Sequence, residues 1–498
     1  MGNPITPDSL IDRFFSASLE ELLEERLAAD PEAGILRLFQ RTAESVPAYR
    51  KFLAERGIDP GTITTLAAFQ KLPLTTKSNY VHAFPLPERC PDGRLWDCDR
   101  VAVSSGSTGQ PTFWPRGLRH ELEVALRFEQ LFKDSFRAHE RSTLAVVAFA
   151  LGNWVGGMYT TSCLWHLARK GYPLLVATPG NKPEEIFRVI RELAPHFQQT
   201  VLLGYPPFLK DVIDAGLAEG IPWHRFRVKT VFAGEVFSEE WRALVGRRLG
   251  GGSPCYDSAS LYGTADGGVL GIETPLSIAI RRFFADHPNA ARQLFGETRL
   301  PTLVQYDPSS CYFETHEDTL VFSGDRGLPL IRYHIADQGG LVGYEQMRAF
   351  LAEAGAPSLA NYGLDETRPV PPFPFVYVFG RADFTVSFYG ANIYPENIAV
   401  GLEQPQIMEW VTGKFVLEAK ETSDGDKYLN VTVELLPGIA PDSEKSLIIA
   451  ESIRLQLLRL NSEFANYTPT DKQLPWVSLR SFGDPEFFPS GVKHRYTR

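Results

Sequence analysis

Residues 104–112 read SSGSTGQPT and follow the short apolar run VAV. Gly106 and Gly109 allow backbone conformations that other residues resist, and successive backbone amides in such a turn can face inward and bind an anion. Four hydroxyl groups add further donors, those of Ser104, Ser105, Ser107 and Thr108. The segment contains neither a Walker pattern nor a dinucleotide-binding glycine pattern. By itself it is typical either of a polyphosphate-binding loop or of a plain surface loop.

Four later segments decide between these alternatives: LYGTADGG (261–268), LIRYHIAD (330–337), FGRADFTVSFYGANIYPENIA (379–399) and SGVKHRYTR (490–498). With 104–112 they resemble, in the same order, the motifs of the acyl-adenylate-forming (AMP-binding) superfamily, which includes acyl-CoA synthetases, peptide synthetase adenylation domains and luciferases. Two further segments are similar to its phenylacetate–CoA ligase branch: 46–85, which contains that branch's Leu-Pro-x-Thr-x-Lys element, and FAGEVFSEEWRALV (232–245). The resemblance covers most of the chain.

The resemblance implies an ATP-dependent ligase. Such an enzyme joins a carboxylic acid to ATP as an acyl-adenylate, releases pyrophosphate, and transfers the acyl group to the thiol of coenzyme A. The expected cofactors are therefore ATP, Mg²⁺ and coenzyme A, and the expected partner is a small carboxylic acid. Two alternatives stay open: delivery to a carrier-protein thiol or another nucleophile, and a degenerate homologue that binds nucleotide or acyl ligand without turnover.

Roles for individual residues follow from the same resemblance. The loop 104–109 would hold the β- and γ-phosphates, and Lys493 would bridge the carboxylate and the α-phosphate. In the 261–268 block, Tyr262 would stack on adenine, followed by Gly263. Asp337 would bind the ribose through its carboxylate, and Arg381 would contact phosphate or ribose. Asp383 would be the hinge residue.

The 261–268 block departs from the superfamily at two positions. Asp266 stands where a glutamate helps to hold Mg²⁺, and it keeps the hard oxygen that this ion prefers. Ala265 stands where serine or threonine is usual, so one hydroxyl near the phosphates is missing. We therefore expect Asp266 to act as both the catalytic and the metal-binding carboxylate, and these departures motivate the degenerate alternative.

Three segments would line the acyl pocket in this fold: 148–157, 204–209 and 233–237. Their aromatic side chains and their glycine favour a flat acid, aromatic or arylacetic. The candidate substrate-binding residues are Phe149, Trp154, Tyr205, Gly234 and Glu235. Apolar residues at strand ends are, taken singly, more often ordinary core residues.

The domain organisation is expected to be α/β. The resemblance implies a large multi-sheet N-terminal adenylation domain over 1–380 and a small mobile α+β C-terminal domain over 381–498. Between 144 and 249, short apolar runs alternate with helical segments, which predicts a mainly parallel sheet covered on both faces. Residues 19–56 have helical periodicity, whereas 69–86 predict a loop.

Composition limits the remaining possibilities. A net charge of −10 over 498 residues argues against nucleic acid as the main partner. The 5 cysteines include no C-x-x-C pair, which predicts free thiols in a reducing compartment and no zinc site. The N-terminus lacks the features of a secretory signal, and the longest apolar run is about half a membrane span. We therefore expect a cytoplasmic protein with no membrane partner, and the branch suggests a homodimer.

Overall fold

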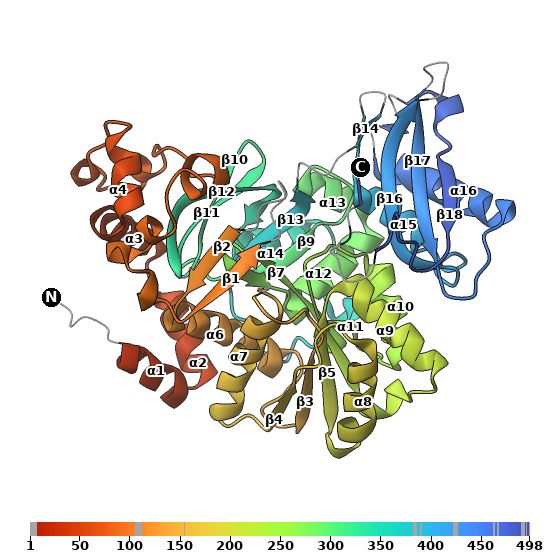
Figure 1. Ribbon diagram of the computed structural model, residues 1–498, viewed down its shortest axis with the longest axis horizontal. Coiled ribbons are helices and arrows are strands. Elements are labelled where there is room, and N and C mark those ends of the chain that lie inside the picture. The colour runs from red at the N-terminus through yellow and green to blue at the C-terminus, as the bar shows by residue number, and fades with distance from the viewer. Residues whose placement is uncertain are drawn as a thin grey trace.

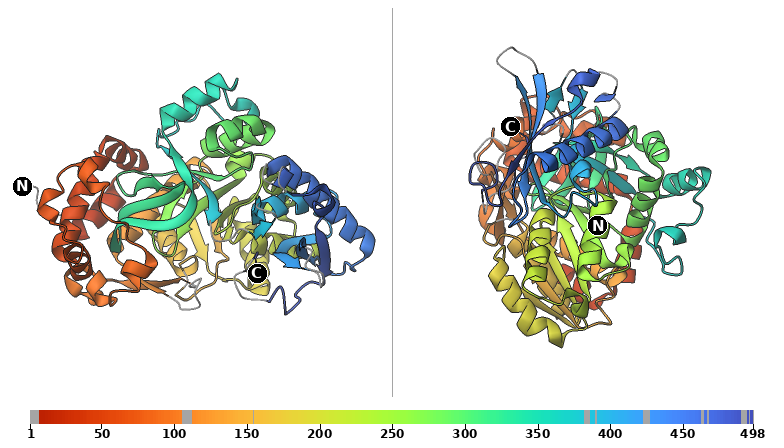
Figure 2. Two further views of the ribbon diagram at one scale, coloured as in Figure 1. Left: turned by 90° about the horizontal axis from the view of Figure 1, so that it is seen from above. Right: turned by 90° about the vertical axis from the view of Figure 1, so that its right-hand side faces the viewer.

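The computed structural model describes residues 7–104, 112–153, 155–381, 386–388, 391–421, 427–461, 464–465, 468–489, 494 and 496–497. The N-terminal helices and the C-terminal sheet lie at opposite ends of the molecule, with a large twisted sheet between them (Figure 1, Figure 2). No described helix is both long enough and apolar enough to cross a membrane.

The central sheet has 11 strands among the described residues, in the order β10-β11-β12-β13-β9-β8-β7-β6-β5-β3-β4. Only the strands from β4 to β7 pair in parallel, and the remaining neighbours are antiparallel. The bounds are β3 (Thr143–Val147), β4 (Leu174–Ala177), β5 (Gln199–Gly204), β6 (Val228–Ala233), β7 (Ser258–Thr264), β8 (Gly268–Ile272), β9 (Thr302–Gln305), β10 (Tyr312–His316), β11 (Thr319–Arg326), β12 (Leu328–Val342) and β13 (Phe375–Arg381).

The prediction of a mainly parallel sheet is therefore wrong for about half of the strands. Parallel neighbours need a crossover connection of a dozen or more residues, which the helical segments between 144 and 249 provide. The connections from β10 to β11 and from β11 to β12 are too short for a crossover, and Gly327 turns the second one with φ +87°. These short turns force antiparallel hairpins.

Helices cover both faces of the parallel strands. Ala145 and Val147 of β3 pack toward α6 (Leu118–Asp134) and α7 (Gly157–Arg169), whereas Leu144 and Val146 pack on the opposite face. That second face carries α8 (Pro183–Leu193), α9 (Pro206–Ala218) and α10 (Glu239–Leu249). Successive side chains of a strand point to opposite faces, so a continuous apolar run buries both. The predicted two-sided cover is confirmed.

The N-terminal region packs in two places: residues 7–28 lie against α6, whereas residues 31–54 pack against the antiparallel half of the sheet. It contains α1 (Pro7–Ser16), α2 (Leu19–Ala28), α3 (Pro31–Ser45), α4 (Pro47–Ala54) and α5 (Leu66–Phe69), so the helical prediction for 19–56 is confirmed. The predicted loop at 69–86 also holds a π-helical turn, Lys77–Val81, which Thr76 caps. The hairpin of β1 (Arg100–Ser104) and β2 (Thr112–Arg116) follows.

The C-terminal part has a hydrophobic core of its own, built from residues between 386 and 496. Its elements are β14 (Val386–Phe388), β15 (Ala391–Ile393), α15 (Pro395–Leu402), β16 (Val411–Glu421), β17 (Lys427–Leu435), α16 (Ser443–Leu460) and β18 (Trp476–Arg480). This mixed part beside a large α/β part agrees with the predicted fold class. The remaining helices of the large part are α11 (Pro254–Asp257), α12 (Pro275–Asp286), α13 (Pro288–Phe295) and α14 (Tyr344–Glu353).

Candidate active site

Tyr262 and Asp337 meet, although 75 residues separate them in the chain. The Tyr262 hydroxyl donates a hydrogen bond of 2.7 Å to Oδ2 of Asp337, and both side chains are buried. Tyr262 precedes Gly263 near the end of β7, and Asp337 pairs with Arg381 between β12 and β13. The structure thus brings together the residues predicted to bind adenine and ribose.

Asp266 lies in the turn between β7 and β8, inside a network of polar contacts. Its Oδ2 accepts a hydrogen bond of 2.6 Å from the Tyr333 hydroxyl and lies 3.5 Å from Nζ of Lys77. The buried Arg116 donates to the carbonyl oxygens of Ala265, at 2.5 Å, and Asp266, at 2.9 Å. These contacts fix both the side chain and the backbone of the turn.

Burial lowers the pKa of Arg116 to about 10, while the charge of Asp266 opposes that shift. Arg116 therefore stays a cation at neutral pH, and its guanidinium donates hydrogen bonds to backbone carbonyl oxygens. This arrangement holds the turn that carries Asp266 in place.

A single carboxylate at this turn suits Mg²⁺. Mg²⁺ is commonly held by one or two carboxylates together with substrate phosphates and water, rather than by an all-protein cage. Among the described residues, no group of three His, Cys, Asp or Glu side chains could hold a metal ion. Asp266 therefore fits an ion that arrives with a polyphosphate.

Lys77 was not among the predicted site residues. It belongs to the Leu-Pro-x-Thr-x-Lys element, and that element docks on β12 through Thr75, whose amide donates 3.0 Å to the carbonyl oxygen of Arg332. The docking brings the Lys77 ammonium to Asp266. The element itself was the signal that could have identified this residue.

The predicted acyl-pocket residues follow three neighbouring parallel strands. Tyr205 and Gly234 come directly after β5 and β6, and Phe149 lies two residues after the end of β3. They therefore gather at the carboxyl edge of the sheet, where α/β folds bind ligands. Gly234 has φ +95°, and a Cβ there would lie 3.4 Å from the Tyr205 ring. Glycine suits this position because its φ lies in a region that other residues rarely adopt.

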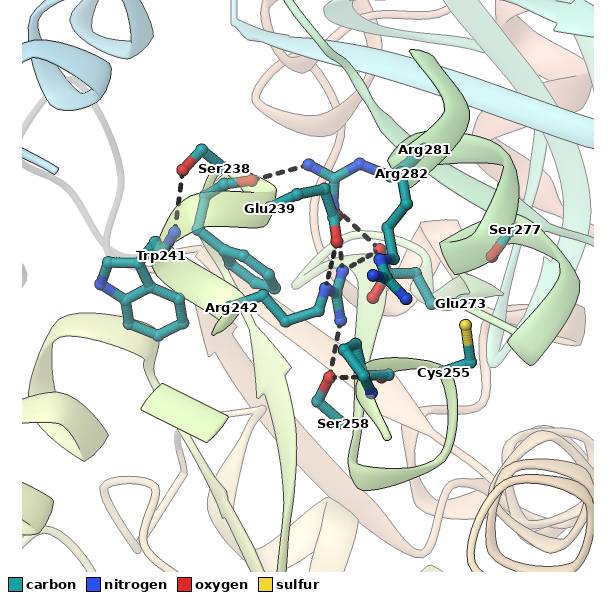
Figure 3. Close-up of polar contacts among 12 residues, drawn as sticks. Ser238, Glu239, Trp241, Arg242, Cys255, Ser258, Glu273, Ser277, Arg281 and Arg282 are labelled. Carbon is teal, nitrogen blue, oxygen red and sulfur yellow. Dashed lines mark hydrogen bonds and ion pairs between the residues drawn. The ribbon is translucent and has the colours of Figure 1, made fainter. Parts of the chain in front are cut away.

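Four buried charged side chains fix the segment that carries Gly234. They form one buried ion-pair cluster (Figure 3), which consists of Glu239, Arg242, Glu273 and Arg281. Arg242 contacts Glu239 at 2.9 Å and Glu273 at 2.7 Å, and Arg281 contacts the same two carboxylates at 3.1 and 3.0 Å.

The buried ion-pair cluster also bonds to the neighbouring backbone and strands. Arg281 donates to the carbonyl oxygen of Phe237 at 2.7 Å, and Arg242 donates to the hydroxyl of Ser258 at 2.8 Å. Phe237 ends the 233–237 segment, and Ser258 begins β7, which leads to Tyr262. The cluster therefore joins the 233–237 segment to strand β7.

The C-terminal part contacts the 233–237 segment directly. The Tyr496 hydroxyl donates a hydrogen bond to Glu235, and burial raises the pKa of Tyr496 well above its usual value. The carbonyl oxygen of Tyr496 accepts from the amide of Leu417 at 2.7 Å, and Nε2 of His494 lies 2.6 Å from the carbonyl oxygen of Phe415. His494, Tyr496 and Thr497 are thus held on β16, and Tyr496 reaches the large part of the molecule.

Charged pairs hold the two parts together elsewhere. Lys414 of β16 contacts Asp211 of α9 at 2.7 Å, and Arg299 contacts Glu396 of α15 at 3.3 Å. Glu403, at the end of α15, hydrogen-bonds to Ser238 at the beginning of α10. Burial raises the pKa of Glu403 to about 7, with a further increase from Glu240 that Ser238 and Arg281 oppose.

Glu403 should make the stability depend on pH. Because its folded pKa exceeds its usual value of 4.5, the folded protein binds a proton that the unfolded chain lacks between these two values. The stabilisation is complete below the unfolded pKa and is lost as the pH rises through about 7. We expect Glu403→Gln to show a smaller loss of unfolding free energy than the wild type between pH 5.5 and 7.5, in urea titrations.

The matched control for this prediction is Glu409→Gln. Glu409 lies on the same part of the chain, but its side chain is 67% exposed. Its pH profile should follow the wild type. Parallel profiles for the wild type and Glu403→Gln would contradict the assignment of this proton to Glu403.

Several predicted site residues lie outside the described part of the chain. They are Ser105, Gly106, Ser107, Thr108, Gly109, Trp154, Asp383 and Lys493. For Ser104 and Arg381 the structure describes the strand backbone, at the ends of β1 and β13, but not the side chain. The assignments of these residues stay predictions.

Comparisons with known proteins agree with the sequence motifs. No family model matches the chain. The chain is 25% identical over 418 residues to a phenylacetate-coenzyme A ligase of Aromatoleum evansii, covering 81% of each protein. It is 23% identical over 404 residues to a phenylacetate-coenzyme A ligase of Thermus thermophilus, covering 79% of each.

A solved structure has the same fold. The 2-hydroxyisobutyryl-CoA ligase in its postadenylation state, in complex with 2-HIB-AMP, aligns with a TM-score of 0.62 at 14% identity, over 100% of this chain and 93% of that chain. The predicted fold class is thereby confirmed. The sequence matches confirm the predicted resemblance to the acyl-adenylate-forming superfamily. Within that superfamily, the chain is similar to the phenylacetate–CoA ligase branch.

Proposed function

We propose that this protein is an AMP-forming acid–coenzyme A ligase that activates an aromatic or arylacetic acid. It joins the carboxylate to the α-phosphorus of ATP, releases pyrophosphate, and then transfers the acyl group to the thiol of coenzyme A. The enzyme class, and the reactants ATP and coenzyme A, are supported by the phenylacetate-coenzyme A ligases that it resembles. The observation that carries the proposal is the hydrogen bond between Tyr262 and Asp337, which joins the two predicted nucleoside contacts.

The first half-reaction brings two anions together, so it needs charge neutralisation and positioning rather than a nucleophilic side chain. Lys77 and Lys493 supply positive charge near the phosphates, and Asp337 accepts hydrogen bonds from the ribose hydroxyls. Asp266 would hold Mg²⁺, which neutralises phosphate charge when it is bound. Tyr333 keeps the Asp266 carboxylate in place through its 2.6 Å hydrogen bond.

The proposed preference for a flat acid is supported by the aromatic side chains at the carboxyl ends of β3 and β5. Tyr205 and Phe149 are partly buried aromatic side chains at adjacent strand ends, and Gly234 lies beside the Tyr205 ring. An aromatic acid would pack against these rings in offset or edge-to-face contacts.

The second half-reaction requires the lysine to withdraw. The proposal includes a division into a large domain over 1–380 and a C-terminal domain over 381–498, with Asp383 as the hinge between two orientations. The contacts between Lys414 and Asp211 and between Tyr496 and Glu235 belong to one of these orientations. A cytoplasmic location and a homodimer remain part of the proposal.

The experiment that tests the function measures pyrophosphate release from ATP and Mg²⁺, with hydroxylamine as a trap for the acyl-adenylate. A panel of aryl, arylacetic and fatty acids identifies the acid class. Release that is selective for aryl or arylacetic acids supports the proposal. The same assay with coenzyme A, or with a phosphopantetheinylated carrier protein, identifies the acceptor. ATP binding without release for any acid favours the degenerate binder.

The role of Asp337 gives a separate prediction. Asp337→Asn should raise the KM for ATP by about 10- to 100-fold, because a hydrogen bond to a charged group contributes about 1.5–3 kcal/mol. Tyr262→Phe should have a smaller effect, since it removes only the hydroxyl that orients Asp337. Steady-state pyrophosphate release at varied ATP measures both.

The control for this comparison is Asp325→Asn. Asp325 lies on the neighbouring strand β11 and pairs with Arg41 at the surface. An unchanged KM for ATP in Asp337→Asn would refute the ribose assignment.

A further inference from the structure

Arg299 belongs to the large part of the molecule, yet it contacts residues from both parts. It follows α13 by a short connection, and only 4% of its side chain is exposed. Within the large part, Nη1 donates 3.3 Å to the carbonyl oxygen of Phe379 and Nη2 donates 3.1 Å to Oε1 of Gln338. Its Nε pairs with Glu297. These contacts fix Arg299 on β12 and β13.

The same guanidinium reaches the C-terminal part. Nη1 donates 3.3 Å to Oε2 of Glu396, in the first turn of α15, and the guanidinium carbon lies 3.7 Å from the centre of the Tyr394 ring. A cation over an aromatic ring is attracted by the negative face of the ring. The predicted hinge, Asp383, lies in the chain between Phe379 and Tyr394. The contacts of Arg299 therefore fall on both sides of the predicted hinge.

Two neighbouring contacts show that the C-terminal part is closely docked at this place. Thr298 donates a hydrogen bond of 3.0 Å to the carbonyl oxygen of Leu460, the last residue of α16. The last four carbonyl groups of a helix have no partner within it, so Thr298 satisfies one of them. A Cβ at Gly380 would lie 2.9 Å from Oε1 of Glu396. Glycine at 380 thus leaves room for the Glu396 carboxylate against β13.

The contacts of Arg299 within the large part lead to the predicted ribose site. Asp337, which accepts a hydrogen bond from Tyr262, is followed directly by Gln338, which contacts Arg299. Successive side chains of a strand point to opposite faces, so Asp337 and Gln338 serve the two faces of β12. Gln338 also pairs with Gly380 across β12 and β13. A ribose on Asp337 and the C-terminal part on Arg299 would therefore share one short stretch of strand.

We propose that Arg299 is a positioning residue that holds the C-terminal part in the orientation seen in the structure and couples this orientation to occupation of the ribose site. When the C-terminal part turns, the contacts to Gln338 and Phe379 stay, because both belong to the large part. The contacts to Glu396 and Tyr394 break. The proposal rests on the proposed function, in which the two half-reactions use different orientations.

We assign the orientation in the structure to the first half-reaction. In this orientation the Tyr496 hydroxyl contacts Glu235 of the predicted acyl-pocket segment. Tyr496 lies three residues after the predicted catalytic Lys493 in the chain. Loss of the contact between Arg299 and the C-terminal part should therefore slow adenylate formation without slowing thioester formation.

The test compares the two half-reactions in the full-length wild type and in Glu396→Gln. Pyrophosphate release from ATP, Mg²⁺ and phenylacetate measures the first, and conversion of synthetic phenylacetyl-adenylate with coenzyme A measures the second. Another acid and its adenylate replace these if the acid panel selects them. Glu396→Gln should slow the first half-reaction relative to the second by about 10-fold, within the usual range of coupling between sites. The variant keeps the buried Arg299 and its pair with Glu297, so the large part should still fold.

The matched control is Glu297→Gln. Glu297 pairs with the same guanidinium and is similarly exposed, at 29% of its side chain against 24% for Glu396, but it belongs to the large part. This variant should keep the wild-type ratio of the two half-reaction rates. Equal slowing of both half-reactions by Glu396→Gln, or the same change of ratio in Glu297→Gln, would overturn the positioning role.

The coupling to the ribose site has a readout that needs no acid. ATP and Mg²⁺ alone should slow amide exchange over 395–402 by at least about fivefold in the wild type, and should not do so in Glu396→Gln. A wild type that binds ATP without this slowing would overturn the coupling. If no acid supports pyrophosphate release while ATP still slows the exchange, the proposed function fails and the coupling stands. A wild type that binds no ATP overturns both.

Discussion

Replacement of Lys493 by alanine should lower the rate of pyrophosphate release by about 10²- to 10³-fold while ATP binding stays largely intact. The expected loss is large because this lysine, in the superfamily pattern, neutralises the charge that develops between the carboxylate and the α-phosphate. ATP binding should survive because, in the proposed site, adenine, ribose and the outer phosphates contact other residues, among them Tyr262 and Asp337. Single-turnover pyrophosphate release and ATP titration measure the two effects separately.

The control for Lys493→Ala is Lys420→Ala in the same part of the chain. Lys420 pairs with Glu418 at 2.9 Å, and its side chain is 41% exposed, so the pair contributes little to stability. Normal turnover by Lys493→Ala would show that the assignment of this lysine is wrong. Equal losses of turnover and ATP binding would point to a fault in folding, which the melting temperature would reveal.

The part of the fold that the sequence predicts best is the part with a regular period. The alternation of apolar runs and helical segments between 144 and 249 correctly indicates parallel strands with helices on both faces. It does not extend to the strands after β7, where short turns such as the one at Gly327 make hairpins. Turn length, rather than strand composition, decides between parallel and antiparallel neighbours.

In the candidate site too, the sequence identifies residues within contiguous motifs but not those whose contacts are distant in the chain. Tyr262, Asp266 and Asp337 are found through motifs, because each motif is contiguous in the chain. Arg116 is missed, since its role is to bond to the backbone carbonyl oxygens of a turn 149 and 150 residues away. Every residue has a backbone carbonyl, so a hydrogen bond to one requires no particular residue type at the accepting position.

The buried ion-pair cluster was missed for a related reason. Glu239 and Arg242 are three residues apart on α10 and could be read as an ordinary surface pair of a helix. Their burial depends on Glu273 and Arg281, which come from the end of β8 and from α12. Only the tertiary structure brings the four charges together.

This cluster leads to the second large expected effect. Arg242→Ala should destabilise the protein by about 3–5 kcal/mol, because removal of one partner leaves a buried carboxylate without its cation. Both arginines of the cluster are nearly inaccessible, with side-chain exposures of 2% for Arg242 and 3% for Arg281. The remaining Arg281 cannot neutralise both Glu239 and Glu273. Urea unfolding at pH 7.5 measures the change.

The pH dependence of this loss distinguishes a missing charge from a missing side-chain volume. Burial opposes ionisation of Glu273, but Arg242 and Arg281 outweigh it and lower the pKa of Glu273 below 4.5 in the folded protein. That stabilisation is present above the unfolded pKa and is lost as the pH falls through the folded one. The difference between the wild type and Arg242→Ala should therefore shrink as the pH falls below 4.5.

A matched surface pair and a double variant complete the test. Arg188, whose side chain is 71% exposed, pairs with Glu185 with the same three-residue spacing, and Arg188→Ala should cost less than about 0.5 kcal/mol.

Arg242→Met combined with Glu273→Gln removes one charge of each sign, so it should be more stable than Arg242→Ala. If the double variant were no better and the loss did not change with pH, the cost would come from packing, and the four charges would not act as one unit. If the double variant recovers, the uncompensated charge, rather than the lost volume of Arg242, accounts for the destabilisation.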